Sequence, residues 1–346
     1  MKIIEIIKPD DWHVHFRDGK ILKAVVPETS RNFKRALVMP NLIPPVITEE
    51  DAVSYKRRIQ NAAPNNDKFL PLMTAYLTEM TDKEDLKRGF INNNIFALKL
   101  YPSGATTNSD LGVKNISKIM PILEMMSKIG MPLLIHGEVT DSEIDIFDRE
   151  KIFIDTVLDM ICKSLPELKV TLEHITTNNA VDYIKSANHN LVASITPHHL
   201  ALNRNALFSG GINPHLYCLP ILKRDIHRKS LVQAATSGNK KFFLGTDTAP
   251  HALKYKENSC GCAGIFNATY ALNIVTQIFD ENQALENLEA FTSINGANHY
   301  KLKINSEKIK IVKKADQINF IKYLKIAKND IVIFKPEFPV YWEVLE

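Results

Sequence analysis

Short β-rich apolar runs alternate with longer segments of helical periodicity along most of the chain. Eight of these runs predict strands: the first ends at the His13–His15 pair, and the others cover 35–40, 69–77, 96–101, 133–136, 169–175, 191–196 and 241–245. Helices are expected between most of them, for example over 48–63, 115–129, 148–164 and 225–236. Strands that alternate with helices are typical of a parallel sheet with helical crossovers. The pattern therefore predicts a (β/α)8 barrel, of the kind called a TIM barrel.

The sequence shows no Gly/Ser-rich linker and no sharp shift of composition, so a single barrel domain over residues 1–346 is expected. Two further strand candidates, at 308–312 and 330–334, predict a small C-terminal β extension. A doubly wound open sheet is the alternative fold. It is disfavoured because the Gly-rich dinucleotide fingerprint is missing after the first strand.

Composition narrows the class of protein. Hydrophobic residues make up 45% and charged residues 24% of the 346 positions, which is ordinary for a globular protein. The net charge of +4 is too mild to indicate nucleic-acid binding. No apolar run reaches the roughly 18 residues that cross a membrane, and the N-terminus lacks a signal-peptide layout. A cytoplasmic location is expected, and Cys260-Gly261-Cys262 is interpreted as a loop rather than half of a metal site.

The segment Asp11-Trp12-His13-Val14-His15-Phe16-Arg17 holds the first candidate chemistry. Side chains two apart on an extended chain point to the same side. His13 and His15 can therefore present two imidazoles to one metal ion, and imidazole suits zinc. Arg17 continues the alternation, so it is expected to face the same space. Its guanidinium is suited to gripping a carboxylate through two hydrogen bonds.

Polar residues also stand at the C-terminal ends of other predicted strands, where barrels of this type carry their chemistry. These residues are Asn41, Lys99, His136, His174 and Asp247. Lys99 lies inside the apolar run 96–101, and an unpaired buried ammonium is costly. A lysine that reaches a carboxylate or water is one explanation. Beside zinc, a neutral amine or a lysine carbamylated by carbon dioxide is another.

The chain resembles the dihydroorotase family of the amidohydrolase superfamily, in its shorter single-barrel bacterial type. The segments that carry the resemblance are DWHVHFRDG, VMPN, KLYPSGATTNS, HGEV, LEHITT, SITPHHL, GTDTAPH and CGCAG. They run from residue 11 to beyond 260, and none departs from the family's pattern at a ligand position.

The resemblance implies two zinc ions per subunit, bridged by carboxylated Lys99 (N6-carboxylysine) and a hydroxide. The implied metal ligands are His13, His15 and Asp247 at the more buried zinc, His136 and His174 at the second, and Lys99 at both. It also implies a set of substrate-binding residues. In that set Arg17, Asn41 and His251 hold the substrate carboxylate, backbone groups near Leu219 and Ala263 contact the ring amides, and Thr106 and Thr107 belong to a loop, 103–112, that closes over the ligand.

The implied activity is the reversible, zinc-dependent cyclisation of N-carbamoyl-L-aspartate to L-dihydroorotate, with Asp247 moving the proton, in pyrimidine biosynthesis. The implied partner is this small-molecule substrate, without nucleic acid or membrane, in a homodimer. Another cyclic amidase (a hydantoinase, dihydropyrimidinase or allantoinase) and a non-catalytic scaffold are the alternatives.

Four further residues are interpreted without a direct role in the reaction. His198 and His199 look like metal ligands, but they are expected to be structural or to support the ligands. Glu138 and Glu173 each stand beside a proposed ligand. They either orient imidazoles or pack in the barrel wall.

Overall fold

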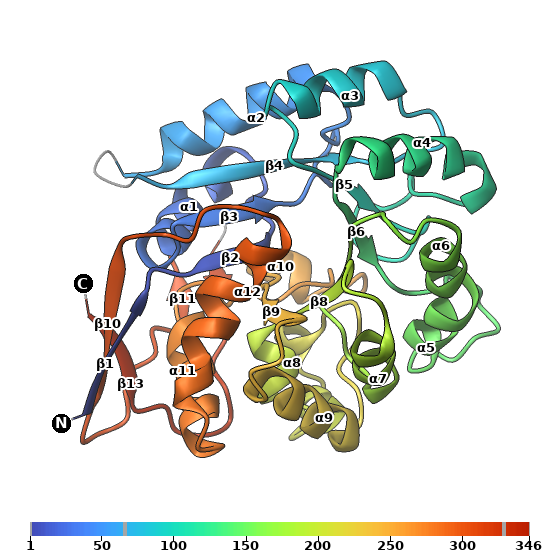
Figure 1. The fold of residues 1–346 in the computed structure, drawn as a ribbon. Helices are drawn as coiled ribbons and strands as arrows, with labels where there is room; N and C mark the ends of the chain where they lie inside the picture. The colour runs from blue at the N-terminus through green and yellow to red at the C-terminus, as the bar shows by residue number, and fades with distance from the viewer. Residues whose placement is uncertain (1, 65–67, 327–329, 346) are drawn as a thin grey trace.

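The computed structural model describes residues 2–64, 68–326 and 330–345. Its central feature is a sheet of eight parallel strands, each hydrogen-bonded to the next along the chain (Figure 1). These strands are β2 (Asp10–Val14), β3 (Arg35–Val38), β4 (Leu70–Tyr76), β5 (Ala97–Leu100), β6 (Leu133–His136), β7 (Val170–Glu173), β8 (Leu191–Ile195) and β9 (Phe242–Leu244).

Backbone hydrogen bonds bring the first and last strands of this sheet together. The Asp247 amide donates to the His13 carbonyl, and the His15 amide donates to the Thr248 carbonyl, each at 2.9 Å. A sheet that curls until its two edges meet is a barrel. The prediction of a (β/α)8 barrel is therefore confirmed, and the bonds that close it involve proposed metal ligands.

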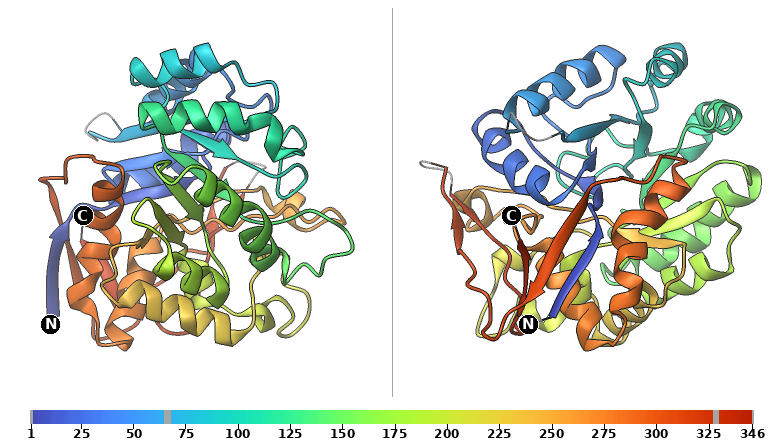
Figure 2. Two further views of the ribbon diagram at one scale, coloured as in Figure 1. Left: turned by 45° about the vertical axis from the view of Figure 1, so that its right-hand side comes forward. Right: turned by 60° about the vertical axis from the view of Figure 1, so that its left-hand side comes forward.

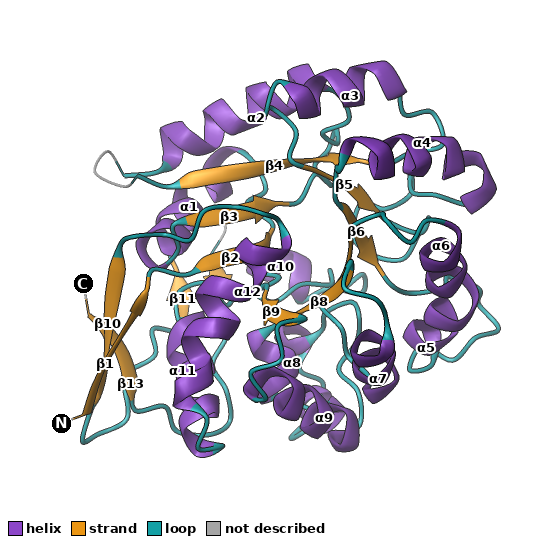
Figure 3. Cartoon of the chain, viewed as in Figure 1, coloured by secondary structure: helices purple, strands orange, loops and turns teal. Residues whose placement is uncertain are grey.

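Helices cover the outside of the barrel (Figure 3). The helices between and after the strands are α1 (Gly19–Asn32), α2 (Glu49–Ala62), α3 (Lys83–Ile91), α4 (Ile116–Ile129), α5 (Arg149–Phe153), α6 (Asp159–Ser164), α7 (Asn178–Ser186), α8 (Pro197–Ala201), α9 (Asp225–Thr236), α10 (Leu253–Lys256), α11 (Ala271–Glu281) and α12 (Asn295–His299). A π-helical turn, Ile154–Leu158, joins α5 to α6, so the single helix predicted over 148–164 is interrupted. None of the helices in the described part of the chain is long and apolar enough to span a membrane.

Local sequence signals fix the ends of several helices. Thr48 and Asp51 form a reciprocal capping box at the start of α2, which satisfies backbone donors that a helix leaves unpaired. Gly130 ends α4 in the left-handed conformation with φ 75°, a geometry that costs glycine nothing. Both ends agree with the sequence-based boundaries.

A separate antiparallel sheet joins the two ends of the chain. It is formed by β1 (Lys2–Ile7), β10 (Lys308–Lys313) and β13 (Trp342–Leu345), and Figure 2 shows β1 beside β10. The prediction had joined the apolar run of β1 to the first barrel strand. That was wrong, because Lys8 and Pro9 separate the end of β1 at Ile7 from the start of β2 at Asp10, and Pro9 has no N–H donor to continue a strand. The predicted C-terminal extension is confirmed by β10. The second candidate is shorter than predicted, since β12 (Ile331–Val332) pairs only with β11 (Tyr323–Leu324).

The strands of the barrel have two buried faces. One face packs on the surrounding helices through the large apolar cluster of the molecule. The other face contributes a second, smaller cluster, which is made of Trp12, Leu37, Met39, Ala97, Leu134, Val192 and Phe243, with Ala297 and Tyr300 from the end of the chain. Successive side chains of a strand alternate between faces, so Lys99, His136 and Glu173 lie on the face of the second cluster. The barrel interior is therefore apolar toward one end and polar toward the C-terminal ends of the strands.

Candidate metal and substrate site

A cavity opens at the C-terminal ends of the barrel strands. It is lined by His13, His15, Arg17, Asn41, Tyr101, Thr106, Thr107, His136, His174, Leu219, Asp247, Ala249, Ala263 and Gly264. All of the predicted site residues except Lys99 and His251 are among them. Residues from β2, β6 and the segments after β3, β5, β7, β8 and β9 thus meet in one place, as the strand-end argument predicted.

Three donor atoms converge at the β2 side of this cavity. The Nε2 atoms of His13 and His15 lie 3.1 Å apart, and Oδ1 of Asp247 lies 3.3 Å from the first and 3.2 Å from the second. Zinc bonds of roughly 2.0–2.2 Å in tetrahedral geometry place nitrogen and oxygen ligands about 3.4 Å apart. The residues present therefore fit one metal ion without rearrangement.

His136 and His174 form the other side of the same cluster. Their ring centroids are 4.8 Å apart, and the His174 ring lies 5.0 Å from that of His13. Nδ1 of His174 is buried and has no hydrogen-bond partner among the described residues. Buried polar atoms are nearly always paired, so this nitrogen is consistent with a metal ligand.

Lys99 lies beneath the histidines and is fully buried. Its ammonium contacts the Glu173 carboxylate, whose other oxygen lies 2.9 Å from Nδ1 of His13. Burial lowers the pKa of Lys99, although the Glu173 charge opposes the shift. The carboxylate partner that the sequence left open is therefore Glu173, which also connects the lysine to His13.

Burial also sets the protonation of the histidines. It lowers the pKa of His15 to about 4 and holds that of His174 well below its ordinary value. Both imidazoles are neutral at pH 7, which is the form that binds a metal. For Asp247, burial raises the pKa, but His13 and His15 outweigh it and the net pKa is lowered. Its carboxylate is therefore ionised.

Left-handed backbone conformations direct three of the site residues. Arg17, His174 and Asp247 have φ values of 59°, 43° and 47°. Non-glycine residues seldom adopt this conformation, and where they do they often mark functional sites. Strand alternation was the wrong reason for the orientation of Arg17, because β2 ends at Val14. The turn at His174 also explains how Glu173 and His174, although adjacent, both reach the metal cluster.

Arg17 and His251 form a polar group beside the metal cluster. Nη2 of Arg17 lies 2.9 Å from Nε2 of His251, and Nε donates to the Pro250 carbonyl at 3.2 Å. Asn41 is placed by its Oδ1, 2.8 Å from Nδ1 of His15. The Arg17 guanidinium and the Asn41 amide therefore border the cavity, and the His251 imidazole contacts the guanidinium. These groups can donate several hydrogen bonds to a carboxylate.

The predicted loop over 103–112 crosses the mouth of this cavity. The Thr107 carbonyl accepts a hydrogen bond from Nδ2 of Asn41 at 2.9 Å, and Oγ1 of Thr107 donates to the Ala263 carbonyl at 3.3 Å. The Thr106 amide donates to Ser109 at 2.9 Å, which closes a turn within the loop. The loop therefore joins opposite sides of the site.

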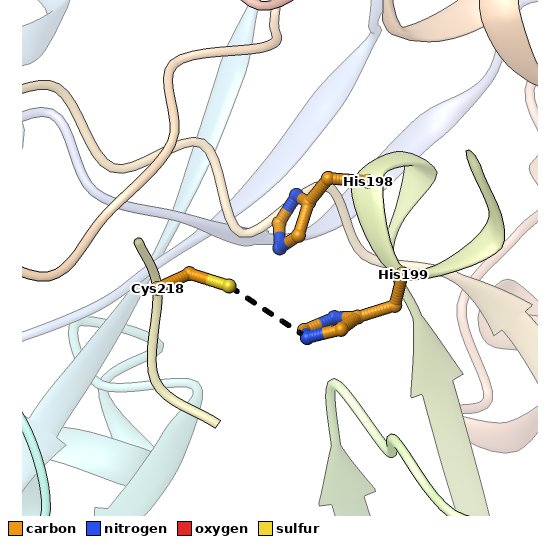
Figure 4. Close-up of side chains that lie close together, drawn as sticks. All are labelled: His198, His199 and Cys218. Atoms are coloured by element: carbon orange, nitrogen blue, oxygen red, sulfur yellow. Dashed lines mark hydrogen bonds between the residues drawn. The ribbon is translucent and has the colours of Figure 1, made fainter. Parts of the chain in front are cut away.

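The third candidate cluster consists of His198, His199 and Cys218, and the sequence reasoning had not included the cysteine. Figure 4 shows both histidines on α8 facing the cysteine of another segment. His199 uses both ring nitrogens, since Nδ1 lies 2.8 Å from Thr196 Oγ1 and Nε2 lies 2.9 Å from the Pro220 carbonyl. These contacts support the prediction that His199 is structural, because it holds the segment that carries Leu219.

Sequence reasoning missed several residues that build the site. Asp11 accepts hydrogen bonds from the Thr246 amide (2.8 Å) and hydroxyl (2.6 Å), which fixes β2 against the segment that carries Asp247. Tyr101 lines the cavity, and an aromatic residue directly after an apolar strand gave no signal.

The two glutamates that the sequence placed beside proposed ligands contact histidines of the site. Oε2 of Glu138 lies 2.7 Å from Nε2 of His136. With the Glu173 contacts, this supports the orienting interpretation for both glutamates over wall packing.

Comparisons with known proteins agree with this architecture. The model of the amidohydrolase family matches residues 6–341. The dihydroorotase of Allorhizobium ampelinum is 52% identical over 344 residues, which is 99% of this chain and 98% of the relative. The crystal structure of dihydroorotase from Campylobacter jejuni has a TM-score of 0.89 at 35% identity, covering 99% of this chain and 98% of that one. Dihydroorotase from Saccharomyces cerevisiae in complex with 5-fluoroorotic acid has a TM-score of 0.91 at 32% identity, covering 100% and 99%.

The chain belongs to the amidohydrolase family, whose fold and metal-binding residue types match the barrel and site described above. Within that family it belongs to the dihydroorotases, because the similarity extends over the full length of such relatives.

Proposed function

We propose that the chain catalyses the reversible cyclisation of N-carbamoyl-L-aspartate to L-dihydroorotate at a two-zinc centre. The observation that carries the proposal is that Arg17, which contacts His251, lies in the same cavity as the cluster of His13, His15 and Asp247. Such a cavity combines hydrolytic metal chemistry with recognition of an anion. Full-length relatives named dihydroorotase support the same reaction, and pyrimidine biosynthesis follows from that name.

The proposed metal ligands are the residues that converge in the structure. His13, His15 and Asp247 would hold one zinc ion, His136 and His174 the second, and Lys99, carboxylated on Nζ, would bridge them. When bound, zinc makes water nucleophilic near pH 7 and polarises a carbonyl oxygen. The burial of Lys99 supports the modification, because a neutral amine is the form that reacts with carbon dioxide.

Asp247 is the residue proposed to move the proton. In ring opening its carboxylate accepts a proton from the attacking water and delivers it to the leaving ring nitrogen. In ring closure the same carboxylate takes the proton from the attacking nitrogen and returns it to the departing oxygen. The ionised state and the inward direction of Asp247 suit this task.

The remaining site residues are proposed to bind and orient the substrate. Arg17, Asn41 and His251 would hold its ring carboxylate, while backbone groups of Leu219 and Ala263 would contact the ring amides. Thr106 and Thr107 would close over it from the loop. The relative from Saccharomyces cerevisiae was solved with 5-fluoroorotic acid, a ligand whose name indicates such an acid.

The Arg17→Met variant should lower kcat/KM for dihydroorotate about 100-fold, since two charge-assisted hydrogen bonds of at least about 1.5 kcal/mol each are lost. Zinc content, measured by metal analysis, should stay at the wild-type value. If turnover of dihydroorotate survives the substitution, the assignment of Arg17 to the carboxylate is wrong.

The test of the proposed function is ring opening of dihydroorotate, followed by loss of ultraviolet absorbance, with dihydrouracil and hydantoin compared. Strong turnover of dihydroorotate alone supports both the metal centre and the carboxylate site. A preference for an uncharged ring would indicate another cyclic amidase. Bound zinc without turnover of any ring would favour the non-catalytic scaffold. The homodimer and the cytoplasmic location stay predictions, which gel filtration with light scattering and cell fractionation can check.

A further inference from the structure

Lys256 is a buried lysine that the proposed reaction does not use. It ends α10, and its side chain is only 3% exposed. The ammonium donates to the carbonyls of Tyr217, Cys262 and Gly264, each at 2.8 Å. An ammonium has three donors, so every one of them is used on the protein backbone.

These carbonyls belong to two segments that are distant in sequence. Tyr217 lies two residues before Leu219, and Cys262 and Gly264 flank Ala263 on both sides. Leu219 and Ala263 line the cavity and are the proposed backbone contacts to the ring. The Lys256 ammonium therefore joins the two segments on which those contacts depend.

Other hydrogen bonds continue the connection toward the site. The Gly264 amide donates to the Tyr217 carbonyl at 3.0 Å, so the two segments also touch directly. The Ala263 carbonyl lies 2.9 Å from Nε2 of His251 and accepts from Thr107. A shift of the Ala263 segment would therefore disturb the carboxylate-binding group and the loop together.

The charge of Lys256 is not compensated by an acid. In the described part of the chain no carboxylate forms an ion pair with it, and burial lowers its pKa to about 8. The Cys218 and Cys262 thiols oppose this shift, whereas Arg17 adds to it. A buried ammonium without a counter-ion is costly, and the hydrogen bonds to three backbone carbonyls are the contacts that offset this cost.

We propose that Lys256 is a positioning residue, whose ammonium holds the Leu219 and Ala263 backbone in the arrangement that binds the substrate ring. The inference rests on the proposed function, since it assumes that these backbone groups contact the ring amides. Lys256 itself does not touch the reacting atoms.

The Lys256→Met variant keeps the length of the side chain and removes all three donors. Its KM for dihydroorotate should rise about tenfold, the equivalent of one lost hydrogen bond of ordinary strength. Its kcat should fall less than about threefold, because a contact made equally in ground and transition states affects KM alone. Lys256→Arg, which keeps the charge and donors, should recover most of the loss. Lys254→Met is the matched control, because Lys254 is exposed two residues away.

The pH dependence of KM provides a second readout. As pH rises through about 8, the Lys256 ammonium loses a proton, and a neutral amine can donate to only two of the three carbonyls. KM of the wild type should therefore rise above pH 8, and KM of Lys256→Arg should not, because a guanidinium stays charged. The neighbouring thiols do not interfere, since burial raises the pKa of Cys218 to about 12 and also raises that of Cys262. The pKa of His251 is shifted far below this range, first by burial and then by Arg17 and Lys256.

Two outcomes overturn the inference. One is a Lys256→Met variant whose KM and kcat equal those of Lys254→Met, even if its melting temperature is lower. The other is the same rise of KM above pH 8 in the wild type and Lys256→Arg, which decides the matter even if Lys256→Met does not fold.

Hydrogen exchange separates this inference from the proposed function. Amides of residues 217–219 and 261–264 should exchange faster in Lys256→Met than in Lys254→Met, whatever ring the enzyme opens. If exchange is faster in Lys256→Met but the wild type does not open dihydroorotate, only the proposed function is contradicted. If exchange is unchanged and the wild type opens dihydroorotate, only the role of Lys256 is contradicted.

Discussion

The Lys99→Met variant is expected to lose at least about 1,000-fold in turnover of dihydroorotate, because metal-ion catalysis contributes several kcal/mol and about 1.4 kcal/mol corresponds to tenfold. Methionine fills nearly the same volume in the fully buried position of Lys99 but has no nitrogen to carry a carboxylate group. The two histidine groups then lack their bridging ligand. Metal analysis of the purified variant should therefore show less than the wild-type zinc content.

Lys169→Met is the matched control for this experiment. Lys169 directly precedes β7, at the opposite end of the barrel from Lys99, and should leave zinc and turnover unchanged. Intact mass under native conditions should show the mass of one carbon dioxide on the wild type and Lys169→Met, but not on Lys99→Met. Full zinc content and near-normal turnover in Lys99→Met would refute both the bridge and the modification.

Much of the fold could be predicted because the barrel strands are buried on both faces. Such strands appear in a sequence as short continuous apolar runs, and helices with capping signals separate them, as at Thr48 and Gly130. The prediction failed where pairing is remote. β1 resembles a barrel strand in composition, yet it pairs with β10, about 300 residues away in the chain. Hydrophobicity alone carries no information on which partner a strand will choose.

The candidate site could be predicted in outline because the fold gathers the strand ends. Once His13, Lys99 and His136 are placed at strand ends, a parallel barrel brings them to one face. Their orientations could not be derived in the same way. Alternation would point Glu173 and His174 to opposite faces, and only the left-handed φ of 43° at His174 shows that both reach the cluster.

Supporting contacts were the least predictable part of the site. Lys256 looks like one of many lysines in the sequence, and its role depends on three backbone carbonyls that only the folded chain brings together. The partners of Asp11 and His199 are likewise backbone groups or residues from other segments. Backbone carbonyls are identical at every position, so a sequence cannot mark the ones that a buried side chain will bind.

The Asp247→Asn variant is expected to lose about 10,000-fold in kcat, the upper end of what general acid–base catalysis contributes. Asparagine has the same shape and tolerates the left-handed backbone of this position, φ 47°. The fold and the bond from its amide to the His13 carbonyl should therefore persist. What disappears is the carboxylate that takes the proton and faces His13 and His15.

Zinc analysis distinguishes loss of proton transfer from loss of metal, and measurement of both reaction directions checks the kinetic constants. An enzyme cannot alter the equilibrium between dihydroorotate and carbamoyl aspartate, so the ratio of forward to reverse kcat/KM must stay constant while both values fall. If kcat falls while zinc is retained at the first site, the loss of activity is due to the missing proton transfer. If one zinc ion is lost, the loss of activity is due to the missing metal ligand. Asp316→Asn, at an exposed position, is the control. A variant at Asp247 that keeps its zinc and turns over within tenfold of the wild type would exclude this carboxylate as the base, and the proton would then have to move through another group lining the cavity.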